Sequence, residues 1–148
     1  MSARAPLRPR SHYRAWRTIP TRWMDNDAYG HVNNVVYYSW FDTAVNAWLV
    51  EAGLLDIRHG PIIGLVVETG CRYAASVAFP DPVEAGVAVA RVGRSSVTWQ
   101  VGIFRKGAAD AAAEGHFVHV YVDRETRRPL ALPDRWRSAL AALAPSAA

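Results

Sequence analysis

The feature that most limits the fold is a polar segment that runs directly into a long apolar one. Residues 21–34 read TRWMDNDAYGHVNN, and residues 35–49 read VVYYSWFDTAVNAWL. On a helix, the few polar residues of the second segment share one narrow stripe: Ser39, Asp42, Thr43 and Asn46. A helix that is apolar around the rest of its circumference must be buried on nearly all sides. We therefore predict a central helix of about twenty residues, ended by Gly53 and wrapped by a sheet.

The rest of the chain supplies strands for that sheet. Between Ile63 and Val77, apolar residues occupy most odd positions, a period of two that predicts a strand with its odd side chains facing inward. The other predicted elements are strands over residues 12–21, 83–92, 97–103 and 117–123, and a short helix over residues 133–144. Because the strands follow one another closely, they predict an α+β fold with an antiparallel sheet wrapped around one long central helix.

Length and composition predict one domain. Residues 1–11 contain three arginines and no carboxylate, so we expect a flexible basic tail before a single domain over residues 12–148. Cys71 is the only cysteine, which rules out an intrachain disulfide and suits a reducing compartment. The sequence has no apolar run of the length that a membrane-spanning helix needs. These features predict a cytoplasmic protein that does not bind membranes.

The positive charge argues against a nucleic-acid partner. The formal net charge is +4, and it comes almost wholly from arginine, since Lys106 is the only lysine. The arginines are scattered along the chain, whereas nucleic-acid binding requires a concentrated basic patch. A diffuse positive potential suits an anionic small molecule equally well, for example one that carries phosphates. Solubility accounts for most of these residues.

The outward positions of the strand over residues 63–77 predict self-association. Several of its even positions carry small or apolar residues: Gly64, Val66, Gly70 and Ala74. A sheet with such an outer face is expected to pair with a second copy. We predict a homodimer or a dimer of dimers, which is a homotetramer.

The polar segment before the central helix is the best candidate for chemistry. The first turn of a helix leaves its N–H groups unpaired, and they carry partial positive charge. Residues 25–34 read DNDAYGHVNN, with Arg22 and Trp23 before them and Tyr37 after them. This stretch resembles the D-x-D-x-x-G-H-V-N-N signature of hotdog-fold thioesterases of the 4-hydroxybenzoyl-CoA thioesterase type. The resemblance extends over residues 12–123 and implies a hotdog fold.

The resemblance also implies an activity and two catalytic groups. It implies that the substrate is an acyl-CoA thioester, that two subunits build each site, and that no metal or bound cofactor is needed. Asp27 corresponds to the catalytic carboxylate, which acts as nucleophile or as general base for water. The backbone N–H of Asn34, expected in the first helical turn, is placed against the thioester carbonyl oxygen. A fixed donor of this kind stabilises the oxyanion as it forms.

Four further residues of the signature are predicted to support these groups. Gly30 lets the loop bend and the substrate approach closely. Asp25 is expected to bond nearby backbone N–H groups, and Asn33 to cap the helix start. His31 is predicted to orient Asp27, to position water or to bond a carbonyl. A metal site formed by the two aspartates and His31 is disfavoured, because no further ligand cluster completes it.

Substrate contacts are predicted at two places. Tyr37, on the central helix, is assigned to substrate binding by its place after the signature. The turn of Arg94, Ser95 and Ser96 offers a guanidinium and two hydroxyls for the phosphates of CoA. Glu68, by contrast, is expected on the outer face of its strand, in an ion pair with Arg72 or in a dimer contact.

Several other functions remain open at this point. A thioester carried by an acyl-carrier protein is a close variant of the acyl-CoA substrate. A hydratase or dehydratase of the same fold is disfavoured, because the Asn33-Asn34 pair is not the pattern such enzymes use. The candidate from another class is a non-catalytic acyl-CoA binding module, and the last is a structural dimer with no ligand.

Overall fold

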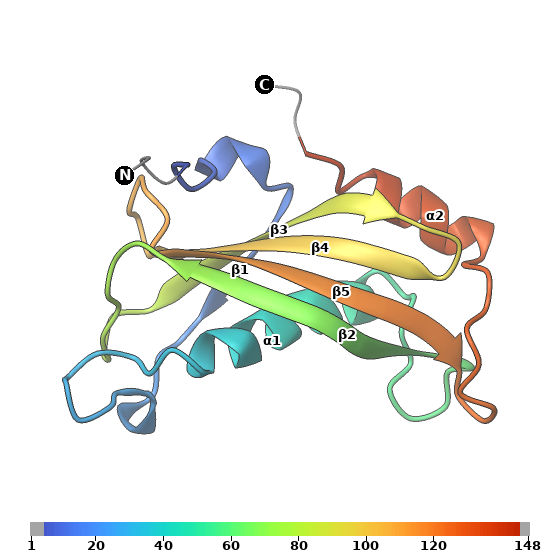
Figure 1. The fold of residues 1–148 in the computed structure, drawn as a ribbon, viewed down its shortest axis with the longest axis horizontal. Coiled ribbons are helices and arrows are strands. Elements are labelled where there is room, and N and C mark those ends of the chain that lie inside the picture. The colour runs from blue at the N-terminus through green and yellow to red at the C-terminus, as the bar shows by residue number, and fades with distance from the viewer. Residues whose placement is uncertain (1–4, 146–148) are drawn as a thin grey trace.

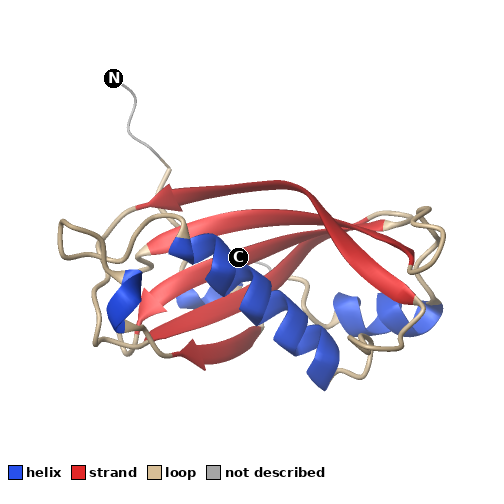
Figure 2. Ribbon diagram, turned by 90° about the horizontal axis from the view of Figure 1, so that it is seen from below, coloured by secondary structure: helices blue, strands red, loops and turns tan. Residues whose placement is uncertain are grey.

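A five-stranded antiparallel sheet holds one long helix against its face in the computed structural model, which describes residues 5–145 (Figures 1 and 2). The order of the strands across the sheet is β1-β3-β4-β5-β2. The strands are β1 (Ala15–Ile19), β2 (Ile62–Tyr73), β3 (Val83–Val92), β4 (Ser96–Arg105) and β5 (Ala113–Asp123). The helices are α1 (Val36–Glu51), α2 (Asp134–Ala141) and the short 3-10 turns η1 (Arg10–His12) and η2 (Trp23–Asp25). The predicted α+β architecture is confirmed.

The helix α1 is shorter than predicted because its N-terminal residues form a separate turn. It contains 16 residues, and Asn34 lies just before it instead of in its first turn. The backbone N–H of Val36 donates to the carbonyl of Asn33, which closes this turn. Gly53 has a φ of +73°, the left-handed conformation that commonly follows a helix, so its predicted role is confirmed. Within residues 5–145, no helix has the length and apolar character to cross a membrane.

The core lies between α1 and the inner face of the sheet. The buried side chains of α1 are Tyr37, Trp40, Phe41, Ala44, Val45 and Leu49. Phe41 packs directly over Gly115 of β5, where any Cβ atom would overlap its ring. Glycine at this position therefore sets how closely α1 approaches the sheet. Trp99 of β4 is fully buried in this core, whereas Phe104 of the same strand is fully buried in a second cluster with Tyr13 and Ala88.

The strand β2 changes face halfway along, which the sequence pattern did not predict. The register of β2 against β5 shifts between Val66 and Glu68, so Val67 is an extra residue in a β-bulge. Beyond the bulge, Cys71 pairs with Gly115 under α1, as predicted for odd positions. Before the bulge, Gly64 pairs with the buried Tyr121, so the even positions face inward there. The prediction is therefore wrong for the first half of the strand, because one extra residue reverses the alternation.

Residues 5–11, part of the predicted N-terminal tail, make hydrogen bonds to the rest of the chain. Arg8 binds the buried carboxylate of Glu114 through both its backbone N–H and its guanidinium. Arg10 donates to Glu84 at 2.7 Å and to the carbonyl of Ala108 at 2.6 Å. Residues 5–11 are thus held against the outer face of the sheet by charge-assisted hydrogen bonds. Residues 1–4 of the expected tail lie outside the described residues.

A buried histidine makes the stability of this core depend on pH. His119 lies against the rings of Phe117 and Tyr121 with 3% of its surface exposed, and burial lowers its pKa from 6.5 to about 4. The unfolded chain therefore binds a proton near pH 6.5 that the folded protein does not bind until about pH 4. We expect the free energy of unfolding to fall by about 3 kcal/mol as the pH drops through this range. Urea unfolding at a series of pH values measures it.

Two single variants identify the titrating group. His119→Gln, which stays uncharged, is expected to lose this pH dependence. His116→Gln is the matched control, because His116 lies on the same strand with its side chain exposed. This variant is expected to keep the wild-type dependence of the unfolding free energy on pH. A slope that persists in His119→Gln would assign the effect to another residue.

Candidate active site

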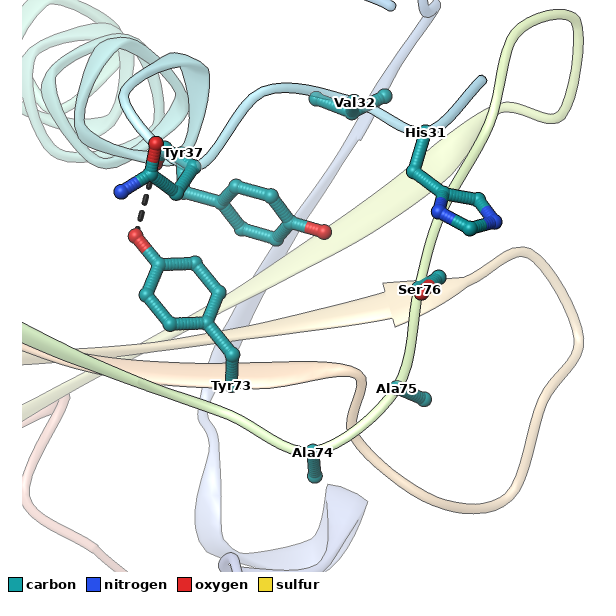
Figure 3. Close-up of a pocket in the computed structure, with 8 residues that line it drawn as sticks. His31, Val32, Tyr37, Tyr73, Ala74, Ala75 and Ser76 are labelled. Carbon is teal, nitrogen blue, oxygen red and sulfur yellow. Dashed lines mark hydrogen bonds between the residues drawn. The ribbon is translucent and has the colours of Figure 1, made fainter. Parts of the chain in front are cut away.

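A cavity of about 270 Å³ opens between the start of α1 and the end of β2 (Figure 3). Its walls come from the loop before α1, from the first turn of α1 and from the segment that follows β2. The residues that line it are His31, Val32, Asn34, Tyr37, Tyr73, Ala74, Ala75 and Ser76. Figure 3 shows the hydroxyl of Tyr37 pointing along the cavity toward His31 and Ser76. The lining therefore combines apolar side chains with a small number of polar groups.

The two peptide units on either side of the Asn34 Cα have one unused polar group. The carbonyl of Asn33 accepts from the N–H of Val36 at 3.0 Å, and the N–H of Val35 donates to the side-chain oxygen of Asn33 at 3.1 Å. The carbonyl of Asn34 accepts from the Tyr73 hydroxyl at 2.7 Å. The remaining group, the N–H of Asn34, has no acceptor among the described residues. It is a free donor on a residue that lines the cavity.

Asp25 fixes the loop that carries this donor. Its carboxylate, 1% exposed, accepts from the backbone N–H of Arg22 at 2.8 Å and from the Arg22 guanidinium at 2.9 Å. Its carbonyl accepts from the N–H of Asn33 at 2.9 Å. Asp25 therefore connects η2 to the turn that precedes α1. Arg22 occupies the Asp25 carboxylate, and residues 5–145 contain no group of three or more His, Cys, Asp or Glu side chains that could hold a metal ion.

Asp27 lies in the same loop but not on the cavity wall. Its backbone N–H donates to the carbonyl of His31 at 2.9 Å, and its half-buried carboxylate accepts from the N–H of Tyr29 at 2.9 Å. Gly30 turns the loop between them with a φ of +82°, which glycine adopts without strain. One hydrogen bond thus separates Asp27 from His31, which does line the cavity. Of the predicted site residues, His31, Asn34 and Tyr37 come together at the cavity.

The two tyrosines of the cavity are uncharged donors at neutral pH. The ring of Tyr37 is buried and packs edge to face against Tyr73, with 5.0 Å between the ring centres. Burial raises the pKa of Tyr37 to about 12, and burial also raises the pKa of Tyr73. Both hydroxyls therefore keep their protons. The Tyr73 proton is used in its bond to Asn34, whereas the Tyr37 hydroxyl has no hydrogen bond to any of the described residues.

The turn of Arg94, Ser95 and Ser96 lies at the other end of the sheet. Ser96 begins β4, and Ile103, near the end of β4, pairs with Ala113, the partner of Tyr73. Seven residues of strand separate the turn from the cavity, roughly 24 Å. In Figure 1 the turn between β3 and β4 lies beside α2, while the loop before α1 lies at the opposite side. Within one chain, this turn does not contribute to the cavity.

The sequence prediction missed Tyr73 and the residues that follow it. A signal was present, because Tyr73 shares the inward parity of Cys71 at the end of its strand. The sequence alone does not show that this strand ends beside the loop before α1. Glu68 is exposed, as predicted, but its partner is His116 at 3.1 Å, and Arg72 pairs with Glu114 instead.

Solved structures of bacterial proteins resemble the whole of this fold. The PA5185 protein of Pseudomonas aeruginosa PAO1 is 54% identical over 95% of this chain and 98% of its own, with a TM-score of 0.91. PA2801, a proposed thioesterase of the same species, is 28% identical over 86% and 98% of the two chains, with a TM-score of 0.78. The DHNA-CoA thioesterase of Staphylococcus aureus is 22% identical over 86% and 88%, with a TM-score of 0.76, and shows a likeness of fold.

Sequence comparison gives a family for most of the chain. No curated protein matches it. Residues 21–140 match the thioesterase-like superfamily, and this range contains the polar loop, α1 and every strand except β1. The likeness to solved thioesterases confirms the hotdog fold predicted from the signature. Because the match covers most of the chain, including every residue that lines the cavity, the chain belongs to the thioesterase-like superfamily.

Proposed function

We propose that the protein hydrolyses acyl-CoA thioesters to a free carboxylic acid and CoA, as the 4-hydroxybenzoyl-CoA type of thioesterase does. The observation that carries this proposal is the unused N–H of Asn34 at the cavity, on a residue whose neighbouring polar groups are all occupied. A thioester carbonyl oxygen placed there would receive a fixed hydrogen bond that strengthens as negative charge develops. The positive end of α1 adds to the same effect.

Asp27 supplies the second half of the reaction in this proposal. As nucleophile, its carboxylate oxygen attacks the carbonyl carbon, the bond to sulfur breaks and CoA leaves as the thiol after it takes a proton. Water then hydrolyses the anhydride that has formed. As general base, Asp27 instead accepts a proton from water while the water oxygen attacks the carbonyl carbon; the bond to sulfur then breaks, and CoA leaves as the thiol after it takes the proton that Asp27 accepted. Either route uses only the substrate, water and this chain, so the proposal assigns no cofactor or metal.

A second copy of the chain is proposed to complete the site. The outer edge of β2 has no partner strand among the described residues, and its Leu65, Val66 and Val67 are exposed apolar residues. An edge of this kind is a template for pairing with another strand. In an antiparallel pairing of two β2 strands, the turn at Arg94 of one copy comes to the same end as Asn34 of the other. That turn then lies where the CoA phosphates can bind it.

Oligomeric state tests this part of the proposal directly. Light scattering at micromolar concentration is expected to give the mass of a dimer or of a dimer of dimers. A monomer at that concentration would contradict the two-subunit site.

The cytoplasm is the proposed location of the protein. Its reducing conditions keep thiols reduced, which agrees with the unpaired thiol of Cys71.

Release of free CoA thiol tests the activity. The wild-type protein is assayed over short, medium, long and aromatic acyl-CoAs, and over the same acyl groups on an acyl-carrier protein. Hydrolysis of a CoA thioester in preference to the carrier-protein thioester supports the proposal, and the panel identifies the acyl group. Preference for the carrier-protein thioester would overturn the choice of substrate. Binding of acyl-CoA without turnover of any member would replace the enzyme with a binding module.

A further inference from the structure

We propose that Tyr73 is a positioning residue that holds the Asn34 N–H in its productive direction, an inference that rests on the proposed function. The Tyr73 hydroxyl donates to the carbonyl of Asn34 at 2.7 Å, the shortest bond in the turn before α1 (Figure 3). The carbonyl and the N–H of Asn34 lie on either side of one Cα. Fixing the carbonyl therefore restricts the rotation that would swing the N–H away from the substrate.

The source of this bond distinguishes it from the others around Asn34. The other bonds of the two peptide units that flank the Asn34 Cα join Asn33 to Val35 and Val36 within one turn of the chain, and Asp25 holds the start of that turn through the N–H of Asn33. Tyr73 comes from β2, 39 residues further along the sequence. It is the contact that ties the Asn34 peptide to the sheet. A donor fixed relative to the sheet is fixed relative to a substrate held between the sheet and α1.

The Tyr73 hydroxyl is itself held in place. Tyr73 pairs with Ala113 of β5, and the next residue, Ala74, donates its N–H to the carbonyl of Ala112 at 2.8 Å. The ring packs edge to face on Tyr37, which is 2% exposed. Backbone pairing and ring packing therefore leave the hydroxyl little freedom. A donor that is rigidly supported needs little reorganisation energy when charge develops on the substrate.

The variant Tyr73→Phe removes this hydrogen bond and keeps the ring. Because one neutral hydrogen bond contributes about 0.5–1.5 kcal/mol, we expect kcat for thioester hydrolysis to fall by up to about tenfold. KM is expected to change less than about twofold, because Tyr73 is proposed to act through Asn34 and not on the substrate. Tyr29→Phe is the matched control, since its side chain is 87% exposed in the same loop, and it is expected to keep the wild-type kcat.

An infrared measurement reports on the donor itself. The probe is an acyl-CoA ketone in which a methylene group replaces the thioester sulfur, with a ¹³C label in the carbonyl. Binding to the wild type is expected to lower the carbonyl stretching frequency relative to water, because the Asn34 N–H polarises the bond. Tyr73→Phe is expected to reduce this shift, while Tyr29→Phe keeps it. Thermal unfolding of each variant confirms that it is folded.

The outcomes separate this inference from the proposed function. If the wild type hydrolyses acyl-CoA and Tyr73→Phe matches it in kcat and in carbonyl frequency, the positioning role is overturned and the proposed function stands. A raised KM with unchanged kcat would make Tyr73 a substrate contact and overturn the role as well. If the wild type hydrolyses no thioester, the proposed function fails and the inference fails with it.

Discussion

Replacing Asp27 by asparagine is expected to lower kcat/KM for thioester hydrolysis at least about a hundredfold, because an amide can neither attack the carbonyl nor accept a proton from water. The fold should tolerate the change. The Asp27 side chain accepts one hydrogen bond, from the N–H of Tyr29, and the amide oxygen of asparagine can accept the same bond. Release of CoA thiol and the Kd for the ketone analogue are measured on both proteins. Binding of the analogue is expected to persist.

A control with the same local geometry is available for this variant. Asp56 also accepts backbone hydrogen bonds within its own turn, from Arg58 and His59 at 3.1 Å, but it lies beyond the end of α1. Asp56→Asn is expected to keep wild-type activity. If Asp27→Asn retains more than about a tenth of the wild-type rate, the carboxylate is not the catalytic group.

A labelling experiment separates the two roles of Asp27. In a single turnover in ¹⁸O-labelled water, attack of water on the aspartyl carbonyl of the anhydride puts the label into the Asp27 side chain and leaves the attacking carboxylate oxygen in the product acid. General-base catalysis puts the label into the product acid, as does attack of water on the acyl carbonyl of the anhydride. Label in the peptide that contains Asp27, measured by mass spectrometry, therefore establishes the nucleophilic route.

Replacing Asn34 by proline is expected to lower kcat by about 10²–10³, which is the usual cost of losing one oxyanion donor. Proline removes the N–H and adds no charge. The N–H makes no hydrogen bond within residues 5–145, so its removal breaks no contact of the folded chain. The thermal unfolding midpoint is expected to stay close to that of the wild type.

Asn34→Ala is the matched variant for this prediction. It removes the side-chain amide and keeps the backbone N–H, so it is expected to retain most of the wild-type kcat. Equal losses in Asn34→Ala and Asn34→Pro would assign the effect to the side chain. A fully active Asn34→Pro would remove Asn34 from the oxyanion site altogether.

The central helix and the sheet around it could be predicted because their signals are local. The narrow polar stripe of α1 and the alternation in β4 each depend on neighbouring residues. The bounds of α1 were less certain, because Asn33 closes a turn that uses side-chain and backbone groups together. The reversal within β2 was not readable, since a bulge depends on the partner strand and leaves no mark in the composition of Val66 to Glu68.

The candidate site likewise contains residues that the sequence could bring together and residues that it could not. His31, Asn34 and Tyr37 line one cavity, and the sequence could group them because they lie within seven residues of one another. Tyr73 joins them through tertiary structure, since β2 returns to the start of α1 only after the sheet has formed. The Arg94 turn was predicted from its residue types alone, which carry no information about distance. Because this turn lies far from the cavity of its own chain, it could contribute only to the cavity of a second copy.

The bulge at Val67 has a consequence for how this protein can vary. The half of β2 that holds Tyr73 toward Asn34 has the opposite alternation to the half that begins at Ile62. Deleting Val67 would remove the bulge and leave Val66 opposite His119 and Glu68 opposite Val118, so both halves would keep their present faces and the Tyr73 hydroxyl would stay at the cavity. Inserting a second residue there would instead have to enlarge the bulge or turn one half of the strand over. Related sequences should therefore tolerate the loss of this residue, or a change in its identity, better than an added residue between Ile62 and Tyr73.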